Sequence, residues 1–112
     1  MSDYSRSMPV MPDEPLDSEE KSQLIGLSSV NVKFTNDVIG LEIANNSETA
    51  IIYLNIAGTP ATVTSGIPIY PRGYYAADRK ILSSIGISII SDTIDTDVRI
   101  IGHYNLQSEI AV

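Results

Sequence analysis

The stretch TAIIYLNIAGTPATVTSGIPIYPRGYY, residues 49–75, decides the fold because it forces the chain to run extended and then to turn. Pro68 and Pro71 stand three residues apart, and neither can continue a helix because proline has no N–H and a fixed φ. Proline also pushes the residue before it toward extended geometry. Pro71-Arg72-Gly73 predicts a tight turn in which proline sets the first central position and glycine tolerates a positive φ. We therefore expect two strands joined by this turn.

The sequence on either side of this stretch repeats the pattern of short strands. Apolar and polar side chains alternate from Val30 to Phe34, which is typical of a strand with one buried face. The run IIYLNI at 51–56 is almost continuously apolar and predicts burial on both faces. Turn signals about every 8–12 residues favour a β-sandwich or small barrel, and we expect a small all-β antiparallel β-sandwich. The seven expected strands cover residues 30–34, 38–44, 51–56, 66–70, 73–77, 85–89 and 98–104.

Residues 1–23 differ from the rest of the chain in composition. Prolines recur at every third position from Pro9 to Pro15, and acidic residues are interspersed among them. Such a segment has too little apolar surface to fold by itself, so it is either a disordered tail or an extended acidic arm that orders on a neighbouring subunit. We expect this arm to precede a β-sandwich domain over residues 24–112. The apolar side chains that the arm would insert into a partner are Met8, Val10, Met11 and Leu16.

Asp17-Ser18-Glu19-Glu20 resembles a helix N-cap followed by a glutamate three positions on. It predicts one short helical turn that runs to Leu24.

Composition narrows the class of protein. A chain of 112 residues is long enough for one domain with one modest core. The formal net charge of −7 argues against direct binding to nucleic acid or to an anionic membrane surface, because both need clustered Lys and Arg. The absence of cysteine excludes disulfides and thiolate metal sites. No apolar run is long enough to span a membrane, and the first residues lack the pattern of a signal peptide. We expect a soluble protein made in the cytoplasm.

Two groups of polar residues are candidates for a chemical site. His103 is the only histidine, and its position in the last expected strand predicts a side chain on the solvent side. Asp92, Asp95 and Asp97 share one loop, but this loop lacks the glycine and the distal glutamate of a calcium-binding loop, so a solvated turn is expected. Neither group predicts a catalytic or metal site, and we expect no enzymatic activity and no cofactor.

Aromatic residues gather beside the proline turn. Tyr70, Tyr74 and Tyr75 lie within six positions of one another, with Arg72 between them. Tyrosine buries its ring and keeps its hydroxyl wet at subunit contacts, so we interpret these four residues as a partner-binding surface. The alternative is a carbohydrate-binding surface, because tyrosine faces can also stack on sugar rings.

The order of turn and core signals from Leu41 to Tyr104 supports a more specific expectation. An Asn-x-Ser turn precedes an Ile-Tyr pair, a Thr-rich loop, the Gly-Ile-Pro-Ile phrase and two closing strands. The residues that carry this order are Ile43, Asn45, Asn46, Ser47, Ile52, Tyr53, Pro60, Ala61, Thr62, Gly66, Ile67, Pro68, Ile69, Pro71, Gly73, Ile87, Ile89, Ile90, Asp97, Val98, Arg99 and Ile100. This order resembles that of a loose group of small β-sandwich virion proteins from tailed bacteriophages.

Two features lie outside the resemblance. Arg72 stands between Pro71 and Gly73, where the group usually has Pro-Gly, so the turn is expected to be one residue longer. Residues 1–23 have no counterpart in the match.

The resemblance implies a structural protein of the virion, assembled in the host cytoplasm. The expected role is a head decoration protein that binds the major capsid protein or other virion subunits through its arm and sheet edges, as a homo-oligomer or in many copies. A neck or tail component and a carbohydrate-binding module displayed on the virion are the alternatives.

Overall fold

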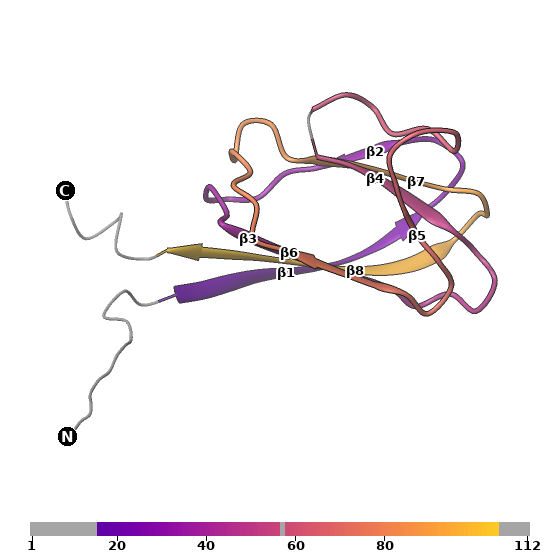
Figure 1. The fold of residues 1–112 in the computed structure, drawn as a ribbon, viewed down its shortest axis with the longest axis horizontal. Coiled ribbons are helices and arrows are strands. Elements are labelled where there is room, and N and C mark those ends of the chain that lie inside the picture. Colours follow the sequence, from indigo (N-terminus) through magenta and orange to yellow (C-terminus); the bar gives the residue numbers. More distant parts are fainter. Residues whose placement is uncertain (1–15, 57, 106–112) are drawn as a thin grey trace, which may run out of the picture.

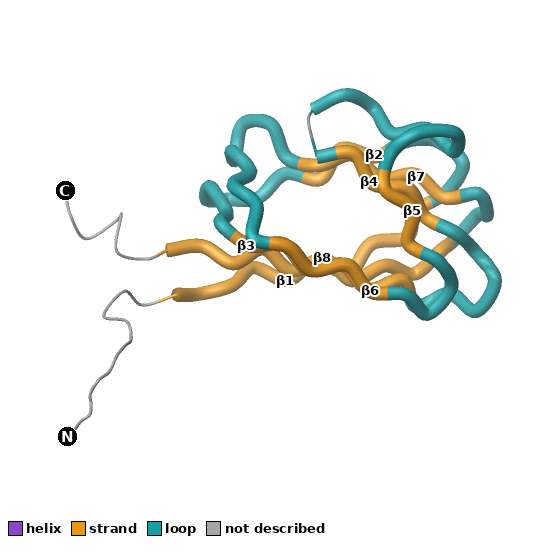
Figure 2. Tube along the Cα trace, viewed as in Figure 1, coloured by secondary structure: helices purple, strands orange, loops and turns teal. Residues whose placement is uncertain are grey.

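The computed structural model describes residues 16–56 and 58–105 of the chain, which form strands and loops (Figure 2). The eight strands are β1 (Leu16–Ile25), β2 (Val30–Val32), β3 (Gly40–Asn45), β4 (Ile52–Asn55), β5 (Ile67–Ile69), β6 (Tyr74–Ala77), β7 (Ile87–Ser91) and β8 (Thr96–Asn105). They make two four-stranded antiparallel sheets that face each other (Figure 1). The predicted all-β sandwich is confirmed. None of the described residues belongs to a helix of the length and apolarity that a membrane span requires.

The order of the strands defines the topology of the sandwich. One sheet has the order β1-β8-β3-β6 and the other has the order β2-β7-β4-β5. If the chain were first folded into one long hairpin, β1 would pair with β8, β2 with β7, β3 with β6 and β4 with β5. Rolling up that hairpin gives the two sheets observed here, which is the jelly-roll arrangement of eight strands.

The core lies between the two sheets and follows the period-two pattern of the sequence. In β3 and β8 every second side chain points into the sandwich, where it faces the inward-pointing side chains of β4 and β7. The fully buried apolar side chains of these four strands are Leu41, Ile43, Ile52, Leu54, Ile87, Ile89, Val98 and Ile100. Burial of branched aliphatic side chains on both inner faces provides the main stabilisation of the fold.

The strand that is buried on both faces is β7 and not the run at 51–56. In β4, Ile52 and Leu54 are buried while Tyr53 and Asn55 are half-buried. In β7 all five residues are buried. The loop after β4 accounts for part of this difference, because the Ala61 N–H of that loop donates a hydrogen bond of 2.9 Å to the Ser88 Oγ on the outer side of β7.

The first strand corrects the interpretation of residues 16–23. These residues belong to β1, which pairs with β8 from Leu16 opposite Asn105 to Ile25 opposite Thr96. The expected helical turn does not form. Pairing with a ten-residue neighbour satisfies far more backbone groups than one local cap, and Glu19 accepts hydrogen bonds from Thr35.

Residues 16–23, which were expected to belong to the arm, are therefore part of the first sheet of the sandwich. The rest of the expected arm, with Met8, Val10 and Met11, lies outside the described residues. Leu16 is described only as the first residue of β1.

The proline turn joins the two sheets at their edges. It connects β5, the edge of one sheet, with β6, the edge of the other. The Gly73 N–H donates a hydrogen bond of 2.7 Å to the Tyr70 carbonyl, which closes a β-turn over residues 70–73. The positive φ belongs to Arg72, at 61°, and not to the glycine. Gly73 serves a different purpose, because a Cβ there would lie 2.6 Å from the Tyr70 carbonyl oxygen.

Candidate functional site

The four residues predicted to bind a partner come from the proline turn and the edge strand β6. Tyr70 and Arg72 are exposed in the turn, and Tyr74 is exposed on the outer face of the sheet. Tyr75 points the opposite way and packs against the core. Tyr74 and Tyr75 therefore do not share one aromatic platform, because successive side chains of a strand point to opposite faces.

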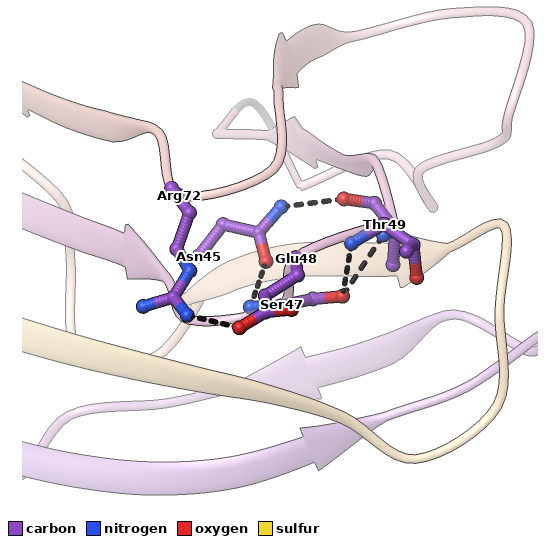
Figure 3. Close-up of polar contacts among 6 residues, drawn as sticks. Asn45, Ser47, Glu48, Thr49 and Arg72 are labelled. Atoms are coloured by element: carbon purple, nitrogen blue, oxygen red, sulfur yellow. Dashed lines mark hydrogen bonds and ion pairs between the residues drawn. The ribbon is translucent and has the colours of Figure 1, made fainter.

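Beneath the turn, the buried side chain of Asn45 connects the two sheets (Figure 3). Asn45 ends β3 in one sheet. Its Nδ2 donates to three carbonyl oxygens at the end of the other sheet, those of Ala50, Ile69 and Tyr70, at 2.8, 3.0 and 3.1 Å. Its Oδ1 accepts a hydrogen bond of 3.0 Å from the Ser47 N–H. All the polar atoms of this buried amide are thus satisfied, as burial requires.

The residues around Asn45 extend this network to the surface. The Ser47 Oγ accepts hydrogen bonds from the N–H groups of Thr49 and Ala50, at 3.1 and 2.9 Å (Figure 3). The Arg72 N–H donates to the Ser47 carbonyl at 2.9 Å, and the Arg72 guanidinium pairs with Glu48 at 2.5 Å. The Asn-x-Ser and Pro-Arg-Gly segments, which are far apart in the sequence, therefore form one structural unit. We call residues 45–50 and 70–73 the clamp.

On the outer face of the same sheet, three polar side chains from three strands meet. Glu42 of β3 accepts hydrogen bonds from the Tyr74 hydroxyl of β6 and pairs with the His103 Nε2 of β8. All three line a shallow hollow of about 390 Å³, whose other lining residues are Gly40, Leu41, Ala76, Ala77 and Asp78. As expected, His103 lies on the face opposite the core. Its position beside Glu42 could not be inferred from the order of residues along the chain.

This contact changes the pKa values of Glu42 and Tyr74. Hydrogen bonds from Tyr74 and then from His103 lower the pKa of Glu42 below its ordinary value of 4.5. The hydrogen bond to Glu42 raises the pKa of Tyr74 above its ordinary value of 10.0. Glu42 thus stabilises the fold above pH 4.5, and this contribution is lost as the pH falls through its lowered pKa. The contribution of Tyr74 to the stability of the fold is present below pH 10 and is lost as the pH rises through the raised pKa of Tyr74.

We expect Glu42→Gln to bring the pKa of Tyr74 back down toward 10.0, because the charged acceptor of its hydroxyl is removed. NMR titration of the tyrosine ring carbons measures this pKa, and Tyr74→Phe identifies the resonance. The matched control is Glu48→Gln, which removes an exposed carboxylate that pairs with Arg72 instead. An unchanged Tyr74 pKa in Glu42→Gln would contradict the contact.

The aspartates of the last turn have separate partners. Asp92 accepts hydrogen bonds from the Ile51 N–H and the Thr93 hydroxyl, at 3.0 and 2.9 Å. Asp97 accepts one from the Asn46 side chain at 3.3 Å. Within residues 16–56 and 58–105, no group of three or more His, Cys, Asp or Glu side chains is arranged to hold a metal ion.

Comparison of the chain with models of protein families, with curated proteins and with solved structures finds no match. The site must therefore be interpreted from its own chemistry. It consists of exposed aromatic and charged side chains on a sheet edge, supported from beneath by the clamp.

Proposed function

We propose that this protein is a non-enzymatic structural component of a tailed-phage virion, where it decorates and stabilises the capsid. The observation that carries the proposal is the jelly-roll topology, because this arrangement recurs in viral capsid proteins. It also occurs in lectins and cupins, and fold alone does not determine function. The resemblance of residues 41–104 to phage virion proteins is what favours the capsid among these roles.

The position of β1 supports a way of attaching to the particle. β1 is an edge strand, and Leu16 begins it next to Asn105, the last residue of β8. Figure 1 shows this two-stranded ribbon at one end of the sandwich. Residues 1–15, which include Met8, Val10 and Met11, are therefore attached at that end. In the proposal they lie on a neighbouring capsid subunit, and the edge of β1 extends the contact.

Two features would support this attachment: the repeated binding sites of a capsid lattice and the negative net charge of the chain. A capsid lattice presents many equal sites, so weak individual contacts can give high occupancy when the bound copies also touch one another. The net charge of −7 keeps crowded copies soluble.

The decisive experiment is binding of the purified protein to expanded empty capsids that lack it, with occupancy at lattice positions measured by electron microscopy. The variant Met8→Ser/Val10→Ser/Met11→Ser is expected to lose at least tenfold in affinity, because each apolar side chain contributes about 1 kcal/mol or more when buried. The matched control is Leu27→Ser/Val63→Ser/Ile94→Ser, which changes three exposed apolar residues of the sandwich and is expected to bind normally.

Absence of saturable binding by the parent protein would refute the capsid role and direct the same assay to portal and tail complexes. Equal binding by both triple variants would refute the role of residues 1–15.

A further inference from the structure

The hollow beside Tyr74 is lined by a glycine that the fold does not require. Gly40 begins β3, and glycine weakens a strand unless a bulge, a tight bend or a close approach calls for it. Its φ is not in the positive range, and its pairing with β8 continues in register, so Gly40 marks no bulge. A Cβ added there would lie 3.6 Å from the His103 Cδ2, which is an ordinary contact. The remaining common reason for glycine in a strand is the close approach of a ligand.

The polar side chains around the hollow still have capacity for hydrogen bonds. One Glu42 oxygen accepts from the Tyr74 hydroxyl, and the other pairs with the His103 Nε2. Each carboxylate oxygen has room for a second hydrogen bond. Asp78, which follows β6, adds an exposed carboxylate to the same lining. These acceptors suit a ligand with several neighbouring donors, such as hydroxyl groups.

Tyr74 supplies the aromatic part of the lining. It is 62% exposed although its hydroxyl is bonded to Glu42, so the exposed part is mostly the ring. The same hydrogen bond holds the ring in place, and a group that is already fixed loses little freedom when a ligand binds. An aromatic ring with carboxylates beside it matches a sugar, which has an apolar C–H face and a rim of hydroxyl groups.

We propose that this hollow binds one neutral hexopyranose ring. Its volume of about 390 Å³ lies within the range of about 300–1,000 Å³ that is usual for small-molecule sites. The two carboxylates, Glu42 and Asp78, would repel an acidic sugar or a phosphate. The site belongs to the folded sandwich itself and does not depend on the capsid role.

NMR titration of the full-length protein tests the site. The probes are the methyl glycosides of glucose, galactose, mannose and N-acetylglucosamine. A ring of about a dozen non-hydrogen atoms in a shallow site predicts a dissociation constant on the order of 1–10 mM. At least one probe is expected to shift the amide resonances of Gly40, Glu42, Ala76 and His103 in a saturable manner, while the resonances of β7 stay unchanged.

The role of the aromatic ring is tested by substitution of Tyr74. Tyr74→Ala is expected to weaken binding at least about tenfold, because the exposed ring is removed. Tyr74→Phe keeps the ring and should lose only about twofold to threefold, because the ring is no longer held by Glu42. The matched control is Tyr70→Ala, which removes an exposed tyrosine of the proline turn that does not line the hollow and should bind normally.

The role of Gly40 is tested by filling the space above it. Gly40→Ala is expected to weaken binding about threefold and Gly40→Val at least about tenfold, because the larger side chain takes more of the space that the sugar needs. Gly26→Ala is the control, since a Cβ there has open space around it and Gly26 does not line the hollow. An amide NMR spectrum checks that each variant remains folded.

Three results would overturn the inference. One is the absence of saturable shifts around the hollow with all four glycosides at about 100 mM, well above the expected dissociation constant. Another is binding that Tyr74→Ala and Gly40→Val both leave unchanged, because the sugar then occupies another surface. The third is binding of free arginine to the same amides as tightly as the best glycoside, because the carboxylates and the ring then select an organic cation.

Discussion

Asn45→Ala is expected to lower the free energy of unfolding by about 2–4 kcal/mol. Asn45 is buried, and its amide pairs with the carbonyl oxygens of Ala50, Ile69 and Tyr70 and with the Ser47 N–H. Alanine leaves these groups without their partner in a region that excludes water, and each unsatisfied group costs about 1–3 kcal/mol, partly relieved by rearrangement. Urea denaturation followed by circular dichroism measures the loss.

The neighbouring asparagine provides the matched control. Asn46 is exposed and donates to Asp97, so Asn46→Ala should change stability by about 0.5 kcal/mol or less. Asn45→Asp should be at least as damaging as alanine near neutral pH, because it places a carboxylate against three carbonyl oxygens. Equal stability of Asn45→Ala and Asn46→Ala would show that the clamp does not hold the sheets together.

The fold was largely predictable from the sequence because local rules and tertiary packing agree over most of the chain. Alternation of apolar residues and the proline turn located seven of the eight strands. The missed strand, β1, has a charged sequence, and only pairing with β8 makes it a strand. A local capping pattern was the stronger signal there, and tertiary context overrode it. The same limit applies to Arg72, which has a positive φ and contacts Ser47 and Glu48, residues that are distant from it in the sequence.

The candidate site was predictable only in part, for a related reason. The turn residues were found because Tyr and Arg stand out next to prolines. Glu42 and His103 are 61 positions apart and come together only because β3 pairs with β8. The clamp had one usable signal, an asparagine at a strand end followed by Ser47, although this pattern predicts a turn and does not reveal the contacts with β5. These residues were missed because their contacts join positions that are distant in the sequence, and not because their side-chain types are uninformative.

The clamp and the outer face depend on the same two strands. Asn45 ends β3 and fixes the turn that leads into β6, while Glu42 of β3 holds Tyr74 of β6. The clamp therefore determines where the edge of β6 lies and how Tyr74 is presented on it. We expect variants of the clamp to reduce partner binding through this geometry, even though Asn45 itself is buried.

The second large effect is expected for Gly86→Ala, which should cost about 3 kcal/mol or more. Gly86 has a φ of +71°, a conformation that costs a residue with a Cβ about 1–2 kcal/mol. The added Cβ would also lie 2.3 Å from the Val32 carbonyl oxygen, well inside the distance at which real atoms meet. Relief requires β2 to move away from β7, where Val32 is paired with Ile87. Urea denaturation measures the stability, and amide exchange at β2 locates the change.

Gly26→Ala separates this clash from a general effect of replacing glycine. No atom lies within 4 Å of a Cβ added at Gly26, and its φ is not in the positive range. This variant should therefore keep the parent stability or gain slightly, because alanine restricts the unfolded chain more than glycine does. Faster amide exchange confined to β2 in Gly86→Ala would identify the contact with Val32 as the cause. A Gly86→Ala protein as stable as Gly26→Ala would show that the loop before β7 can adopt a second conformation at little cost.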